Sequence, residues 1–288
     1  MIHSMTGYAA AHRDLGDAVL HIELKSVNSR YLDIAFRSGE EVRFLEMPLR
    51  EKIAAAVSRG KLECRINLLA QATAPRERSP NRTAIEQLAG MERAVRDALP
   101  GATPLTVAEV LRWPGVLADD AIDQGRLQAE CMALADVAIA DFLASRAREG
   151  GRLADILHER TSRMRDHVAA VGPILPRALA DYEARLAAKL REVLSANDED
   201  RIRQEMGLFA ARIDVAEELG RLTTHLGEAE RVLKKGGAVG KRLDFLMQEL
   251  NREANTLASK SVSTEVTAIA LELKLLIEQM REQVQNLE

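Results

Sequence analysis

The chain is poor in aromatic residues, cysteines and long apolar runs, and each shortage excludes a class of protein. Aromatic side chains make up 3% of its 288 residues, too few for a surface on which successive bases stack. Its two cysteines, Cys64 and Cys131, lack CxxC spacing, so we expect neither a disulfide framework nor a thiolate metal site. No run approaches the roughly 18 apolar residues of a membrane span, and residues 1–14 lack the apolar core of a signal peptide. We therefore expect a cytoplasmic protein that contacts no membrane.

The chain also lacks a strong charge of either sign. A net charge of −4 provides no general attraction for nucleic acid or for an anionic membrane. An acidic protein can still contain a basic groove, so RNA binding has to be argued from particular side chains. The apolar fraction of 47%, with Leu, Ala, Glu and Arg abundant, is typical of a globular protein rich in helices.

Residues 1–70 have the pattern of strands around one helix. Alternating apolar and polar side chains predict strands at 19–24, 31–36 and 62–69, and a fourth strand is expected near 5–10. Apolar residues at steps of four predict an amphipathic helix over 42–58. A polar, proline-containing link follows at 71–81.

Helical patterns dominate the rest of the chain. We predict helices at 82–99, at 104–112 with Thr103 as N-cap, and at 125–148 closed by Gly150. Further helices are predicted at 152–195 with a kink or a tight break near Pro173 and Pro176, from a cap at Asn197 or Asp198 to about 235, at 241–260, and from about 263 almost to the end. The predicted fold class is α+β, with a strand-rich α+β module followed by a bundle or hairpin of long helices. The predicted domains are 1–150 and 151–288.

The segment 241–260 carries two stripes when it is drawn as a helix. The apolar stripe consists of Leu243, Leu246, Leu250, Ala254 and Leu257. The polar stripe consists of Asp244, Gln248, Asn251 and Asn255. Asn is a poor helix former, and short amides can fix a ligand as well as solvate a surface. A functional face and an ordinary polar face therefore both stay open.

A first group of candidate site residues lies upstream of this segment. Asp214, Glu218, Arg221 and His225 recur at steps of four, three and four, which predicts one shared helix face. Carboxylate oxygens and an imidazole nitrogen are ligands for a divalent metal. The same spacing also suits a solvated charged face, and this alternative stays open.

A second group lies in the segment 241–260 itself. Glu249 and Glu253 are one helical turn apart, and such carboxylates hold Mg²⁺ or Mn²⁺, which polarises a phosphoryl oxygen and activates an attacking water. Arg252 or Lys260 would offset the charge on the phosphate. His225 is a candidate base as well as a candidate ligand, because free imidazole titrates near neutrality. The predicted catalytic residues are Glu249, Glu253, His225 and Arg252, and the predicted metal ligands are Asp214, Glu218, Glu249 and Glu253.

A third group consists of basic and amide side chains that suit contacts with phosphates or bases. The predicted RNA-binding residues are Lys25, Asn28, Arg30, Lys61, Arg242 and Lys260. For the N-terminal members, a basic loop that merely joins two strands is an equally good interpretation.

Several separate motifs follow one another along the chain, in the order SMTGYA, KSVNSRYLDI, RGKLEC, LRWPGV, REGGRL, RIDVAEELGRL and RLDFLMQELNREANTLASKS. Together they resemble the bacterial YicC/YloC family over the whole chain. This resemblance implies an endoribonuclease that depends on a divalent metal, with RNA as substrate. It also implies a ring-like homo-oligomer, a hexamer, with other RNA-decay proteins as candidate partners. It assigns no catalytic residue, so the roles given above rest on side-chain chemistry alone.

The sequence is therefore consistent with two functions of different classes. The first is an endoribonuclease that cleaves RNA by metal-assisted phosphodiester hydrolysis, with small-RNA turnover as its process. The second is a non-catalytic oligomeric RNA-binding scaffold that recruits other ribonucleases. Substitution of Glu249 or Glu253 by Gln distinguishes them, because only an enzyme would lose cleavage while it keeps RNA binding.

Overall fold

The computed structural model describes residues 1–16, 18–70, 80–117, 123–193 and 199–288. Its strands are β1 (Gly7–Asp14), β2 (Ala18–Val27), β3 (Leu32–Ser38) and β4 (Gly60–Ala70). Its helices are η1 (Glu40–Leu45), α1 (Glu46–Ala56), α2 (Arg82–Ala98), α3 (Val107–Arg112), α4 (Gln124–Val193), α5 (Glu199–Ile213), α6 (Ala216–Lys235), α7 (Gly240–Lys260) and α8 (Thr264–Val284). The predicted α+β class is confirmed. The predicted link at 71–81 lies mostly outside the described residues, as do the predicted caps Asn197 and Asp198.

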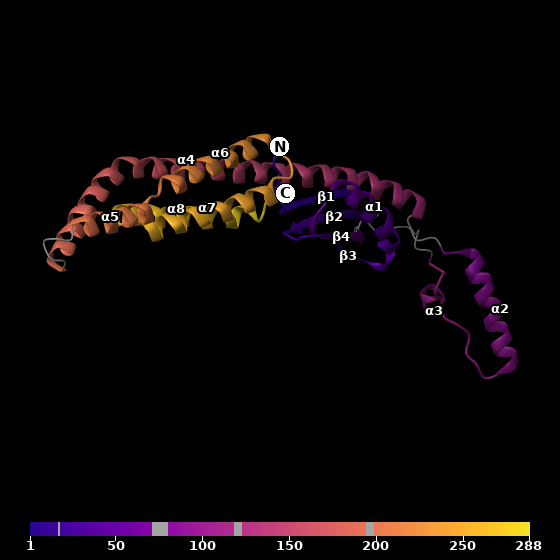
Figure 1. Ribbon diagram of the computed structural model, residues 1–288. Coiled ribbons are helices and arrows are strands. Elements are labelled where there is room, and N and C mark those ends of the chain that lie inside the picture. Colours follow the sequence, from indigo (N-terminus) through magenta and orange to yellow (C-terminus); the bar gives the residue numbers. More distant parts are fainter. Residues whose placement is uncertain (17, 71–79, 118–122, 194–198) are drawn as a thin grey trace.

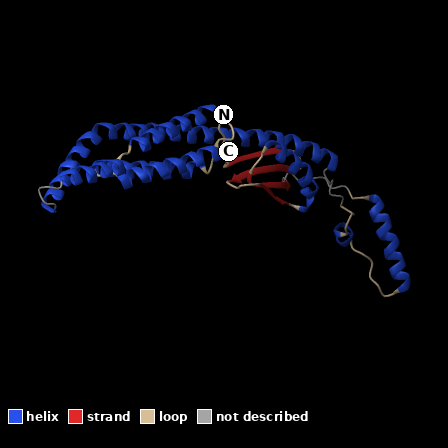
Figure 2. Ribbon diagram, viewed as in Figure 1, coloured by secondary structure: helices blue, strands red, loops and turns tan. Residues whose placement is uncertain are grey.

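The molecule is elongated, with the sheet near its middle, the long helices towards one end and α2 and α3 on an arm at the other (Figure 1). Figure 2 shows the four strands lying alongside one part of α4. In the part of the chain that the structure describes, no helix combines the length and the apolar character needed to cross a membrane.

The sheet has the strand order β1-β2-β4-β3, in which only β3 and β4 run parallel. Alternate residues of β2 and β4, such as Leu20, Leu24 and Ile66, are buried against α1 and the first half of α4. Cys64 and Cys131 are free thiols in this core, and burial raises their pKa values to about 12 and about 11. All four predicted strands and the helix between them are confirmed.

A second core lies between the latter half of α4 and the helices α6, α7 and α8. Every residue of the apolar stripe predicted for 241–260 is buried there, and Leu243, Leu250 and Leu257 are completely buried. The polar stripe of the same helix is half-buried or exposed. This helix therefore packs in the way its periodicity predicts.

Helix α4 continues through Gly150, so the predicted stop there is wrong. Of the kink or tight break predicted near Pro173 and Pro176, the break does not occur, because both prolines lie inside the continuous helix. A Cβ atom on Gly150 would lie 2.2 Å from the carbonyl oxygen of Ile2. Glycine is therefore needed for the close approach of the N-terminal segment to a continuous helix, and not as a helix stop. At ~1.5 Å per residue the helix is about 105 Å long and spans both cores. The predicted domain boundary at residue 150 falls inside it.

The helix predicted to run to about 235 is interrupted at Asp214, where α5 ends and α6 begins. The Asp214 carboxylate accepts a hydrogen bond from the Ala216 backbone N–H at 2.9 Å, and Lys260 donates to the Asp214 carbonyl at 3.0 Å. Such local bonds compete with the helical pattern, so Asp214 precedes α6 instead of lying within it. The N-cap of α3 is Thr106, in a capping box with Glu109, and not Thr103.

Candidate functional site

Two ion pairs join α6 to α7 at the end of α7 that is near Lys260. Glu218 is only 4% exposed, and its Oε1 lies 2.8 Å from the Lys260 ammonium nitrogen. Glu253 is 3% exposed and lies 3.4 Å from the Arg221 guanidinium, which also pairs with Glu217. Both buried carboxylates are thus neutralised by a cation from the facing helix, the arrangement that buried charges require.

The Glu218 carboxylate is ionised despite its burial. Desolvation raises its pKa, but the hydrogen bond and charge of Lys260, the backbone N–H of Glu218 itself and the charge of Arg221 outweigh desolvation. The pKa of Glu218 is therefore below its ordinary value of 4.5. Its second oxygen, Oε2, is buried and has no hydrogen-bond partner in the part of the chain that the structure describes. The neighbouring charges of Glu217 and Glu253 raise the pKa of Arg221.

The pairing of the two helices places His225 level with Glu249. Arg221 of α6 lies beside Glu253 of α7, and Arg242 lies beside Glu228 at 3.4 Å. The two helices are therefore antiparallel. His225 lies one turn after Arg221 and Glu249 lies one turn before Glu253, so these two residues are at the same height along the helix pair. His225 and Glu249 are both half-buried. Among the described residues, neither side chain has a hydrogen bond or an ion pair.

The structure separates the four predicted metal ligands into two kinds. Glu218 and Glu253 are committed to ion pairs, and Asp214 accepts the Ala216 N–H. Glu249 is the one that has no such partner within the described part of the chain. In residues 1–16, 18–70, 80–117, 123–193 and 199–288, no three His, Cys, Asp or Glu side chains lie close enough to hold a metal ion. The described residues of a single chain therefore do not form a complete metal site.

The predicted RNA-binding residues are distributed over several surfaces. Asn28 and Arg30 line one cavity with the start of α7, whereas Lys25 lines another beside Arg148 and Arg152 of α4. Lys61 is exposed on β4. The two remaining cations already have acidic partners, Arg242 with Glu228 and Lys260 with Glu218. Of this predicted set, the structure brings together only Asn28 and Arg30.

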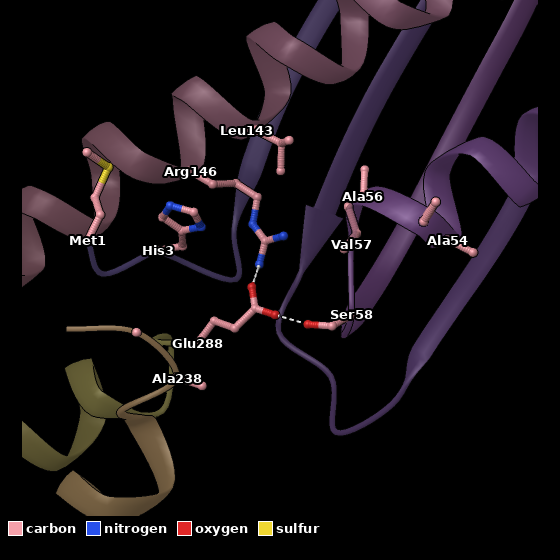
Figure 3. A pocket seen from close by; sticks show the side chains of 12 residues that line it. Met1, His3, Ala54, Ala56, Val57, Ser58, Leu143, Arg146, Ala238 and Glu288 are labelled. Carbon is pink, nitrogen blue, oxygen red and sulfur yellow. Dashed lines mark hydrogen bonds and ion pairs between the residues drawn. The ribbon is translucent and has the colours of Figure 1, made fainter.

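A cavity of about 440 Å³ lies where the two ends of the chain meet between the sheet and the helices (Figure 3). Arg146, 1% exposed, donates to the Ser4 carbonyl and pairs with the side chain of Glu288, which also accepts from Ser58 (Figure 3). The Glu288 N–H donates to the His3 carbonyl at 2.9 Å. The charges of Arg146 and Glu288 neutralise each other and tie the C-terminus to α4, so we interpret this cavity as a structural junction.

Comparison with known proteins finds relatives over the full length of the chain. Residues 2–155 match the model described as "Endoribonuclease YicC-like, N-terminal region", and residues 171–288 match "Endoribonuclease YicC-like, C-terminal". The chain is 43% identical to a protein of Haemophilus influenzae named "Probable endoribonuclease YicC", over 100% of both chains. A protein of the same name from Clostridioides difficile is 26% identical, again over 100% of both chains. The chain belongs to the YicC-like endoribonuclease family.

Proposed function

We propose that the protein is an endoribonuclease and that its reactive surface is formed by His225 and Glu249 on facing turns of α6 and α7. Membership of the family supports the activity. The observation that supports this location is that these two side chains are level with each other and unpaired within the described structure, whereas the buried carboxylates next to them are neutralised. A side chain without an ion-pair partner can take up or release a proton during the reaction, which general acid–base catalysis requires.

In this proposal His225 is the general base. It takes the proton from the hydroxyl that attacks phosphorus, and Glu249 stabilises the resulting imidazolium. A new P–O bond forms while the P–O bond to the leaving ribose oxygen breaks, and that oxygen takes a proton from solvent. Arg252, exposed three residues beyond Glu249, offsets the charge that develops on the phosphoryl oxygens.

The predicted requirement for Mn²⁺ or Mg²⁺ stays a prediction. The described residues of one chain do not bring three suitable ligands together, so no metal ion is given a role in the proposed proton transfer. Glu249 is the predicted ligand that remains free to contribute to a site completed by other groups, for instance those of RNA or of a second subunit.

We further propose a homo-oligomer, with the family resemblance indicating a hexamer. The exposed apolar stripe of α2 supports self-association, since Met91, Val95 and Leu99 recur at steps of four and are each more than half exposed. A stripe of this kind on an isolated arm suits burial against another copy of the chain.

The test compares cleavage and binding of a labelled RNA by the wild type and by the variants His225→Gln and Glu249→Gln. We expect at least a ~100-fold loss of cleavage rate with RNA affinity preserved, since general acid–base groups contribute about 10²–10⁴ in rate. Glu86→Gln makes the same charge change on the exposed surface of α2 and should leave cleavage unaltered.

A parallel series adds EDTA and then restores Mn²⁺ or Mg²⁺. Loss and recovery of cleavage would establish the metal requirement. If a rigorously purified wild type binds RNA but never cleaves it with any metal, the scaffold hypothesis replaces the enzyme.

A further inference from the structure

A cavity of about 260 Å³ lies between the N-terminal module and the first turn of α7. Its lining includes Asn28, Arg30, Arg59, Gly240, Lys241 and Asp244. Its volume is slightly below the ~300 Å³ at which pockets for whole small molecules begin. The size therefore suits one charged group of a larger ligand.

The cations of this cavity are not neutralised. Arg59 has a buried Nε that finds no hydrogen-bond partner among the described residues, and a buried donor of this kind is costly unless a ligand satisfies it. Arg30 lies over the Tyr31 ring at 5.3 Å, and within the described residues neither Arg30 nor Lys241 has an ion pair. These three cations face a single carboxylate, that of Asp244.

Asp244 is itself engaged outside the cavity. Its carboxylate accepts a hydrogen bond from Gln248 at 2.8 Å and lies 3.5 Å from the Nε of Arg281. The contact with Arg281 is an ion pair without hydrogen-bond geometry, since that Nε has no hydrogen-bond partner. The positive charge of Arg30, Arg59 and Lys241 thus remains in excess.

The backbone adds to this positive potential. Gly240 is the first residue of the 21-residue helix α7, and Val239 provides no side-chain cap for its free N–H groups. A Cβ atom on Gly240 would lie 2.4 Å from the Leu287 carbonyl oxygen, so glycine allows the helix to begin directly against the C-terminal turn. Asn28 donates to the Gln285 carbonyl at 2.7 Å and holds the N-terminal loop against the same turn. The walls of the cavity are therefore held in place without a ligand.

We propose that this cavity binds a phosphate group of the RNA chain. The proposal rests on the proposed function in taking RNA as the ligand. It adds two residues, Arg59 and Lys241, that are not among the predicted RNA-binding residues. Lys241 and Arg252 lie on the same side of α7, with the exposed Gln248 between them. They are roughly 16 Å apart at ~1.5 Å per residue. At ~3.4 Å per stacked nucleotide, the bound phosphate is about four or five nucleotides from the one cleaved.

The test measures the affinity of a fluorescent single-stranded RNA over a series of salt concentrations for Lys241→Gln and Arg59→Gln. Loss of one phosphate contact should weaken binding about tenfold at low salt and reduce the slope of log K against log salt by about 0.7. The matched control is Arg82→Gln, the same charge change on the exposed surface of α2, which should keep both the affinity and the slope of the wild type. Lys241 is exposed, so this variant remains informative if Arg59→Gln folds poorly.

Two further measurements decide the source of the phosphate and separate this inference from the proposed activity. If inorganic phosphate raises the melting temperature of the wild type but not of Lys241→Gln, while both bind RNA alike, the cavity binds a free anion and the RNA assignment is overturned. If the wild type shows a steeper salt dependence of RNA binding than the two cavity variants but does not cleave RNA, only the proposed activity is contradicted. If the wild type cleaves RNA and both cavity variants keep the salt dependence of the wild type, only the proposed phosphate binding by the cavity is contradicted.

Discussion

At its C-terminal end, α7 places Lys260 against the buried carboxylate of Glu218, whereas at its N-terminal end Lys241 faces a cavity with Arg30 and Arg59 and no free acid. Both lysines are terminal residues on the polar side of one helix, and their surroundings give them opposite roles. Where a cation meets a buried acid, its charge stabilises the fold. Where cations gather without an acid, their charge is available for a ligand.

The largest expected difference between the two ends is in stability. Lys260→Met leaves the Glu218 charge buried and unpaired, which should lower the free energy of unfolding by about 3 kcal/mol. Lys241→Met removes an exposed side chain that forms no ion pair with any described residue, and we expect a change in the free energy of unfolding below ~0.5 kcal/mol. Urea denaturation of both variants measures the two values.

A double variant provides the control for this comparison. Glu218→Met combined with Lys260→Met removes the stranded charge and should recover much of the loss caused by Lys260→Met alone. Equal losses in the two single lysine variants would show that the pair with Glu218 is no more important to stability than an exposed lysine.

A smaller effect is expected in the pH dependence of stability. Because the pKa of Glu218 is lowered in the folded protein, its ionised form stabilises the fold fully above its ordinary value of 4.5. This contribution is lost as the pH falls through the lowered folded pKa. The difference in melting temperature between the wild type and Glu218→Gln should therefore be constant near neutrality and shrink in acid. A difference that grows as the pH falls would contradict the assignment.

The smallest effect is expected at Glu228, beside the cavity end of α7. The hydrogen bond from Arg231, followed by the charge of Arg231 and the contacts with Arg242, lowers its pKa to about 2 although burial acts in the opposite direction. Both arginines are largely exposed, so solvent and salt screen the interaction. Glu228→Gln should leave the melting temperature at physiological salt almost unaltered. A loss comparable to that of Lys260→Met would show that pairing at the two ends of α7 does not differ.

The secondary structure followed from local patterns in most of the chain. Alternation predicted β2, β3 and β4, and the apolar stripes predicted α7 and α8, because burial on one side of an element repeats with its own period. Two of the errors lie where a distant segment contacts the residue concerned. The carbonyl of Ile2 lies against Gly150, and Lys260 of another helix donates to the carbonyl of Asp214.

The candidate site was less predictable than the fold. Sequence spacing grouped Glu218 and Glu253 with Glu249 as equivalent carboxylates, and the structure neutralises the first two and leaves the third unpaired within the described residues. Arg59 carried only the weak signal of a basic residue next to the turn at Gly60, and its unpartnered Nε becomes visible only in the folded chain.

The sequence by itself determined the family, the α+β order of elements and the stripe of α7 that enters the core, since periodicity and motif order need no knowledge of neighbours. Only the tertiary structure decided which charges are neutralised and which are available. That decision depends on residues that are far apart in the chain and meet in the fold, such as Lys260 in its ion pair with Glu218 and Lys241 in the cavity that it lines with Arg59. The free energy of a charge depends on the groups packed around it, and no local pattern records those groups.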